Sequence, residues 1–209
     1  MIQKFEEKGY KIVNSEEEAD IYIINTCTVT NMSDRKSRQM LRRAHELNKD
    51  AIIVAVGCYA DVAKEELSKI KEINLILGNS EKKNIVDHVE NYINHNDVNI
   101  ESSEEYNEFG CITYTERTRA TIKVQDGCNN FCTYCIIPYA RGRIKSRKKE
   151  SILEEIEKIA EKGIKEVVIT GIHIASYGKD FDNNYRLIDL LEDINKIEGI
   201  ERIRIGSLE

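Results

Sequence analysis

Short runs rich in Ile and Val alternate with helical segments along most of the 209-residue chain. Apolar runs of this length, bounded by turn-prone residues, are typical of strands buried in a parallel sheet. In the first half they predict strands at residues 21–27, 51–58 and 73–78. Helical spacing of apolar residues predicts helices at residues 33–47, 61–71 and 80–93, each beginning with a residue that suits a helix N-cap. This order predicts an α/β fold in which residues 1–95 form a doubly wound domain on a parallel sheet.

The second half repeats the alternation after a polar, acidic stretch at residues 96–117, which we interpret as a linker. Further strands are predicted at residues 120–127, 166–172 and 202–208, and helices at residues 150–162 and 186–197. This pattern favours a (βα) barrel domain over residues 118–209. Such a barrel normally takes about eight strands, so we expect it to be incomplete at Glu209. Doubly wound domains usually begin with a strand, so we also expect a strand before Met1.

The composition is that of an ordinary globular protein, with 41% hydrophobic and 33% charged residues. No apolar run reaches the roughly 20 residues needed to cross a bilayer. The first residues are acidic where a secretory signal would be basic and then apolar. We therefore expect a cytoplasmic protein without a membrane partner. In a reducing compartment, the six cysteines are expected to serve in metal or catalytic sites rather than in disulfides.

Three cysteines, Cys128, Cys132 and Cys135, follow the first predicted strand of the barrel. Thiolates are the usual ligands of iron–sulfur clusters, and a four-iron cluster usually takes four. Three local thiolates would therefore keep one iron open for a cofactor. Chemistry in βα barrels lies at the carboxyl ends of the strands, which is where this loop is expected. The alternative is a zinc site, which would need a fourth ligand; Cys111 is the nearest candidate.

The spacing Cys-x-x-x-Cys-x-x-Cys after a first barrel strand resembles the radical S-adenosylmethionine (SAM) superfamily. The resemblance implies a first part of a radical SAM barrel, in which the open iron chelates SAM and reductive cleavage yields a deoxyadenosyl radical. It implies that Tyr134 lies near the adenine of SAM and that the segment around Gly171 contacts the methionine amino group. His173 belongs to that segment, with a capped loop histidine as the alternative. A SAM contact from Ser207 is implied as well.

A closer resemblance covers nearly the whole chain. The strings at residues 25–31, 57–60 and 127–142 are similar to those of radical SAM methylthiotransferases, and the first string, Asn-Thr-Cys-Thr-Val-Thr-Asn, resembles the MtaB type. That type implies 2-methylthiolation of N6-threonylcarbamoyladenosine beside the tRNA anticodon. Sister types act on isopentenyladenosine in tRNA or on an aspartate of a ribosomal protein, and these remain alternatives.

The methylthiotransferase resemblance also implies a second, auxiliary four-iron cluster that supplies sulfur. Cys27 and Cys58 match two of its three ligands, and the third would precede Met1. Each of the two cysteines ends a predicted parallel strand, so both are expected at one edge of the sheet, where ligands of doubly wound folds gather. The alternative is that they are ordinary buried cysteines.

A basic run follows the cysteine loop, and Arg141, Arg143, Lys145 and Arg147 are its candidate RNA contacts. The alternative is a solvated charged face. The family resemblance implies a tRNA anticodon stem-loop as partner and an electron donor of the flavodoxin or ferredoxin type; the oligomeric state is left open. The rival function is a non-catalytic metal-binding protein, either an electron carrier or an RNA-binding module. We expect the 209-residue polypeptide alone to be inactive, because a ligand strand and most of a barrel are not in it.

Overall fold

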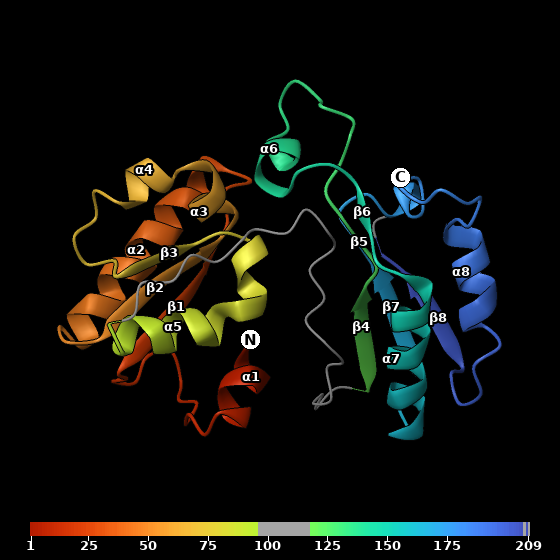
Figure 1. The fold of residues 1–209 in the computed structure, drawn as a ribbon, viewed down its shortest axis with the longest axis horizontal. Coiled ribbons are helices and arrows are strands. Elements are labelled where there is room, and N and C mark those ends of the chain that lie inside the picture. The colour runs from red at the N-terminus through yellow and green to blue at the C-terminus, as the bar shows by residue number, and fades with distance from the viewer. Residues whose placement is uncertain (96–117, 207, 209) are drawn as a thin grey trace. The chain divides into compact units, whose positions relative to one another are not determined.

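The computed structural model describes residues 1–95, 118–206 and 208. It divides into two compact units, Met1–Ser103 with Tyr134–Ala140, and Glu104–Thr133 with Arg141–Glu209 (Figure 1). The linker predicted at residues 96–117 lies outside the described residues, so its boundaries stay a prediction. No helix among the described residues is long and apolar enough to cross a membrane.

The first unit is built on a parallel sheet in the order β1-β2-β3. The strands are β1 (Ile21–Thr26), β2 (Ile52–Gly57) and β3 (Leu75–Leu77). The helices are α1 (Ile2–Glu7), α2 (Asn31–Leu47), α3 (Cys58–Val62), α4 (Lys64–Leu67), the 3-10 turn η1 (Ser80–Asn84) and α5 (Ile85–Ile93). The α/β class predicted from the alternation is confirmed.

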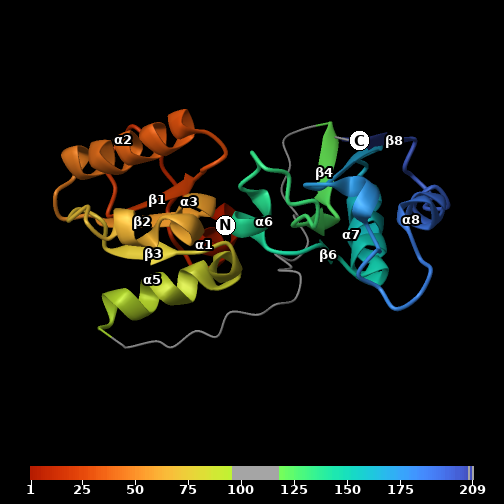
Figure 2. The same ribbon diagram turned by 90° about the horizontal axis from the view of Figure 1, so that it is seen from above.

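Both faces of this sheet are covered, because side chains of β2 alternate between two apolar cores. Ile53 and Ala55 pack with α2 residues such as Leu41, while Val54 and Val56 pack on the opposite face with residues of α1 and α5. Figure 2 shows α2 on one side of the sheet and α5 on the other. Covering both faces leaves the strand ends as the place where polar chemistry can be exposed.

One predicted helix, residues 61–71, forms differently. The chain makes α3 and then α4, with Ala63 between them outside the helical region at φ −124° and ψ 39°. Asp61 does not cap a helix but accepts the backbone N–H of Asn79, with Oδ2 at 3.1 Å. The helix begins three residues earlier than predicted, and Cys58 is its first residue.

The second unit contains a parallel sheet in the order β4-β7-β8 and an antiparallel pair, β5 with β6. The strands are β4 (Arg119–Lys123), β5 (Gln125–Asp126), β6 (Lys145–Ser146), β7 (Glu166–Thr170) and β8 (Arg202–Ile205). The helices are α7 (Lys149–Glu161), the 3-10 turn η2 (Ile174–Ser176) and α8 (Leu187–Ile194). Helix α6 (Ile137–Arg141) belongs to the first unit except for its last residue.

The core of the second unit lies between one face of its parallel sheet and two helices. Ile122 of β4 and Ile169 of β7 contribute from the strands, and Ile156 of α7 and Leu190 of α8 from the helices. Each of these side chains is at most 2% exposed. The strand-helix order places the loops after β4 and β7 at the same, carboxyl edge of the sheet.

The strand predicted at residues 120–127 is divided at Val124. The Val124 N–H donates to Thr170 O at 2.9 Å, while its carbonyl accepts from Arg147 N–H at 2.9 Å. The chain therefore leaves β7 and pairs with β6 just before the cysteine loop. Sequence analysis did not predict β6, because two residues are too short for a periodic pattern.

Candidate metal centre

The cysteine loop, residues 127–135, begins with a buried sulfur fixed by backbone groups. Cys128 is 9% exposed, and its N–H donates to Gly142 O at 3.2 Å. Its Sγ accepts the Asn130 N–H at 3.5 Å. Backbone N–H donors on sulfur are a common way to stabilise and tune a cluster ligand.

Gly127 allows this loop to close on the returning chain. Its φ is +69°, and a Cβ there would lie 1.9 Å from Arg143 O and 2.7 Å from Gly142 O. A side chain at this position would push the two segments apart, so glycine is required by both the backbone angle and the close approach.

Asp126 anchors the same turn electrostatically. Its Oδ1 accepts the Gly127 N–H at 2.9 Å, and its Oδ2 pairs with Lys123 and, at 3.3 Å, with Arg141 Nη1. Burial raises the pKa of Asp126, but the two cations and the Gly127 N–H outweigh it and lower that pKa overall. The carboxylate is therefore ionised at neutral pH and fixes the loop to β4 and to the end of α6.

The donors of this loop fit an iron–sulfur cluster. Cys132 is exposed, Cys135 is half-buried and Cys128 is buried, and the role of the three thiols as cluster ligands stays a prediction. In residues 1–95 and 118–206, no three His, Cys, Asp or Glu side chains converge as a single metal ion would need. A cluster makes a different demand, because each thiolate binds a different iron. Tyr134, expected near the adenine of SAM, is 91% exposed.

Cys27 and Cys58 lie at one edge of the sheet in the first unit, as predicted. Thr26 at the end of β1 is paired with Gly57 at the end of β2, and the two cysteines follow these residues directly. Cys27 is exposed and Cys58 is 4% exposed. Their role as cluster ligands stays a prediction.

Asn79, which sequence analysis missed, contacts this edge. Its Nδ2 donates to Cys58 Sγ at 3.4 Å and to Asp61, while its Oδ1 accepts from Lys82 Nζ at 2.8 Å. Because Lys82 can only donate, the amide nitrogen must face the sulfur. The available signal was a polar residue two positions after the end of β3, at the edge where ligands gather.

The segment after β7 is fixed by a side chain from β5. The backbone N–H groups of Ile172 and His173 both donate to Gln125 Oε1. The His173 ring bonds Ser176 Oγ within the η2 turn, which supports the loop-histidine alternative. The roles of Gly171 and His173 toward SAM stay predictions, and Ser207 lies outside the described residues.

Three of the four basic candidates are at least partly exposed to solvent. Arg143 is exposed, with its guanidinium carbon 4.4 Å from the centre of the Phe131 ring. Lys145 is half-buried, and half-buried Arg141 pairs with Asp126. These three keep the RNA-contact prediction open.

Arg147, the fourth basic candidate, is buried, which disfavours its predicted contact with RNA. The side chain is 7% exposed, its guanidinium forms an ion pair with Glu155, and Nη2 donates to Ser151 Oγ at 2.8 Å. A cation already desolvated and paired inside the protein cannot reach a phosphate without breaking that pair. In the structure, Arg147 joins β6 to α7 through Ser151 and Glu155.

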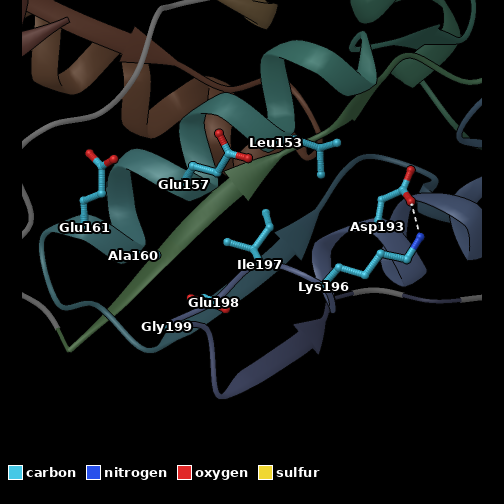
Figure 3. A pocket seen from close by; sticks show the side chains of 9 residues that line it. All are labelled: Leu153, Glu157, Ala160, Glu161, Asp193, Lys196, Ile197, Glu198 and Gly199. Atoms are coloured by element: carbon cyan, nitrogen blue, oxygen red, sulfur yellow. Dashed lines mark hydrogen bonds and ion pairs between the residues drawn. The ribbon is translucent and has the colours of Figure 1, made fainter.

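A pocket of the second unit lies away from the cysteine loop. It has a volume of about 750 Å³, and Figure 3 shows its lining from α7, α8 and the segment before β8. Glu157, Glu161 and Glu198 make it acidic, and Asp193 pairs with Lys196 at 2.8 Å. Because this segment leads into the amino end of β8, the pocket is on the side of the sheet away from the cysteine loop.

Two family descriptions match the chain in succession. Residues 1–78 match "Uncharacterized protein family UPF0004", and residues 122–207 match "Radical SAM superfamily". A protein of Aquifex aeolicus named threonylcarbamoyladenosine tRNA methylthiotransferase MtaB is 45% identical over 98% of this chain. The Bacillus subtilis protein of the same name is 41% identical over 99% of it.

Over nearly its whole length, the chain is similar to proteins named as tRNA methylthiotransferases. It spans about half the length of the curated relatives it matches, 51% of the Aquifex protein and 47% of the Bacillus protein. A protein with a different name is also similar to this chain. The Desulforamulus reducens protein named tRNA-2-methylthio-N(6)-dimethylallyladenosine synthase is 36% identical over 95% of this chain and 46% of its own length.

A solved structure supports the fold of this chain. The radical S-adenosylmethionine methyltransferase TsrM from Kitasatospora setae, solved with cobalamin and a [4Fe-4S] cluster bound, matches 77% of this chain and 39% of its own. The TM-score is 0.51 at 18% identity, so the likeness concerns the fold alone.

Proposed function

We propose that this protein takes part in forming the 2-methylthio derivative of N6-threonylcarbamoyladenosine beside the tRNA anticodon. The supporting observation is the pairing of two cysteine sets in one chain. Cys128, Cys132 and Cys135 follow β5, while Cys27 and Cys58 end neighbouring strands of a separate sheet. The similarity to two proteins named as threonylcarbamoyladenosine tRNA methylthiotransferases supports the choice of substrate.

In this proposal the three-cysteine loop binds a four-iron cluster and SAM, and Cys27 and Cys58 contribute to an auxiliary cluster. When bound, these groups supply one-electron chemistry at carbon and a source of sulfur. The chain itself fixes the ligands: Gly127 closes the loop around Cys128, and Asn79 donates to the Cys58 sulfur. Iron–sulfur chemistry suits the donor set because all five proposed ligands are thiols.

The proposed partner is the anticodon stem-loop of tRNA. Arg143, stacked on Phe131, offers an exposed cation beside an aromatic face next to the cysteine loop. Unpaired loop bases stack on such faces, and cations contact the phosphates. An electron donor of the flavodoxin or ferredoxin type and a cytoplasmic location complete the proposal.

The deciding experiment is mass spectrometry of tRNA nucleosides from cells with and without the complete gene. We expect deletion to abolish the 2-methylthio form of threonylcarbamoyladenosine and to leave methylthio-isopentenyladenosine unchanged. The gene with Cys128, Cys132 and Cys135 all changed to Ala should fail to restore the product. The exposed control Gln39→Ala should restore it.

Other outcomes would replace this function. Loss of the isopentenyl derivative would move the protein to the group represented by the Desulforamulus relative. Unchanged tRNA with an unmodified ribosomal-protein aspartate would make it the third type. Zinc without visible-range absorbance in the purified protein would support the non-catalytic rival.

The auxiliary cluster has its own test. The double change of Cys27 and Cys58 to Ala should lower iron per chain by about half after anaerobic reconstitution, because four irons accompany each cluster. The SAM-responsive electron paramagnetic resonance signal should survive, since its ligands are untouched. Iron content equal to that of the unmodified chain would exclude these cysteines as ligands.

A further inference from the structure

Gln125 is a completely buried side chain between the cysteine loop and the segment after β7. Its exposed fraction is 0%. Nε2 donates to the carbonyls of Asp126 at 2.6 Å and Gly127 at 2.7 Å, and Oε1 accepts from the N–H groups of Ile172 at 3.0 Å and His173 at 2.8 Å. A primary amide has two N–H donors and two acceptor lone pairs, so these four bonds use its full capacity.

The orientation of this amide is set by its partners. Backbone carbonyls only accept and backbone N–H groups only donate, so exchanging the amide nitrogen and oxygen would turn all four bonds into repulsions. Glutamine is also the side chain that supplies this donor-acceptor pair at the right length. A glutamate would present at most one donor, and an asparagine is shorter by one methylene.

Gln125 acts where the backbone ladder between the two segments ends. β4 pairs with β7 as far as Lys123 opposite Thr170, and Val124 N–H donates to Thr170 O. Beyond this point the chain turns away and pairs with β6. Beyond the end of the ladder, the side chain of Gln125 joins the two segments instead. It bonds the backbone at residues 126–127, where the cysteine loop begins, to the backbone at residues 172–173.

Gly171 packs closely against the side chain of Gln125. A Cβ at Gly171 would lie 2.9 Å from Gln125 Oε1 and 3.1 Å from its Cβ. Both distances are shorter than normal carbon contacts, so an added methyl group would displace the amide or the strand end. The two residues therefore form one packing unit, although the chain separates them by 46 positions.

We propose that Gln125 is a positioning residue that sets the distance between the cysteine loop and the backbone at residues 171–173, and thereby the geometry in which SAM binds. This inference rests on the proposed radical SAM function of the cysteine loop. Gln125 touches neither sulfur nor cofactor in this role. It acts through Gly127, which precedes Cys128, and through the two N–H groups that it fixes after β7.

The first test uses the metal-free chain and needs no activity. Gln125→Met keeps the volume and removes all four bonds; Gln125→Glu keeps the acceptor half and loses at least one donor. We expect hydrogen exchange at the Ile172 and His173 amides to rise at least tenfold in the Met variant and to stay near wild type in the Glu variant. Unchanged exchange in the Met variant would overturn the proposal.

The second test measures SAM binding to the anaerobically reconstituted chain, without tRNA. We expect both Gln125 variants to raise the SAM dissociation constant at least tenfold and to reduce the SAM-induced change in the electron paramagnetic resonance spectrum, with iron content retained. Gly171→Ala should also raise the SAM dissociation constant, because the added methyl group would displace the Gln125 amide. In a double-mutant cycle, Gly171→Ala should raise the SAM dissociation constant by a smaller factor in the Gln125→Met background than in the unmodified chain.

The matched control is Ile159→Ala, which removes a buried side chain from the same unit at the far end of α7. It should lower thermal stability without changing the SAM dissociation constant. If it weakened SAM binding as much as the Gln125 variants, Gln125 would be a structural residue only. Because tRNA is absent from both tests, a wrong tRNA substrate would leave these results unaffected.

Discussion

At the scale of single residues, the local context of a charge decides its role. Arg143 and Arg147 belong to one basic run, yet one is exposed on an aromatic ring and the other is paired inside the second unit. The difference lies in Glu155, a buried residue of α7 that forms an ion pair with the Arg147 guanidinium. The basic run therefore contains two different kinds of residue: Arg143 is a surface cation, and Arg147 belongs to a buried ion pair.

We expect Arg147→Ala to destabilise the second unit by about 3–5 kcal/mol, because it leaves the Glu155 carboxylate buried without its charge partner. Chemical denaturation of the metal-free chain measures this. The double variant Arg147→Met with Glu155→Leu removes both charges and should be markedly more stable than the single variant. A single variant as stable as the unmodified chain would show that the pair is not buried in solution.

His88 gives the first unit a dependence on pH. The side chain is 9% exposed, and its Nε2 has no hydrogen-bond partner among the described residues, with Glu81 Oε1 4.0 Å away. Burial lowers the pKa of His88, opposed in part by Glu81 and Asp87. Between that lowered pKa and the ordinary value near 6.5, the unfolded chain binds more protons than the folded one.

Stability of the first unit should therefore be complete above about pH 6.5 and should fall as the pH drops through that window. Thermal melts of the metal-free chain between pH 7 and pH 5 measure the slope. His88→Leu should flatten it, because the neutral leucine side chain takes up no proton. A slope that survives His88→Leu would assign the effect to another group.

At the scale of elements, the string at residues 25–31 has a structural task besides its cysteine. Thr26 Oγ1 donates to Val56 O at 3.0 Å and joins β1 to β2. Thr30 is the N-cap of α2, and its Oγ1 accepts the Ser33 N–H at 3.1 Å. The two threonines on either side of Cys27 thus fix the strand before it and the helix after it.

Thr30→Ala should lower the free energy of unfolding of the first unit by about 1 kcal/mol, the usual cost of losing an N-cap side chain. Thr30→Ser keeps the hydroxyl and should stay close to the unmodified protein. Urea denaturation followed by circular dichroism compares the two. Equal loss in both variants would mean that the methyl group, and not the cap, is what matters.

At the scale of the whole molecule, the described residues form separate apolar cores. The two cores of the first unit and the core of the second share no residue. Each unit therefore buries its own apolar side chains, which is the physical requirement for independent cooperative unfolding.

Calorimetry of the metal-free chain should accordingly show two transitions. Ile53→Ala and Ile156→Ala each remove a side chain with 0% exposure, at a cost of about 2–5 kcal/mol. The first should shift one transition and the second the other, while Met32→Ala, at a 72% exposed position, should shift neither. One transition that moves with both changes would show that the units unfold together.

The sequence alone determined the order of the main strands and helices and the two cysteines that end neighbouring strands. These depend on local periodicity and on residues close along the chain, so Ile/Val runs and turn residues predict them without a tertiary structure. The three-cysteine loop was visible for the same reason, since its ligands lie within a few residues of one another.

Only the tertiary structure decided which polar side chains support the site. Gln125 bonds backbone groups 47 and 48 positions away, Asn79 reaches a sulfur 21 positions back, and Arg147 meets Glu155 8 positions ahead. No periodic pattern records such pairs, because a buried polar side chain is satisfied by whichever groups packing brings within about 3 Å. The sequence identifies the thiols, while the packing of distant segments determines how they are held.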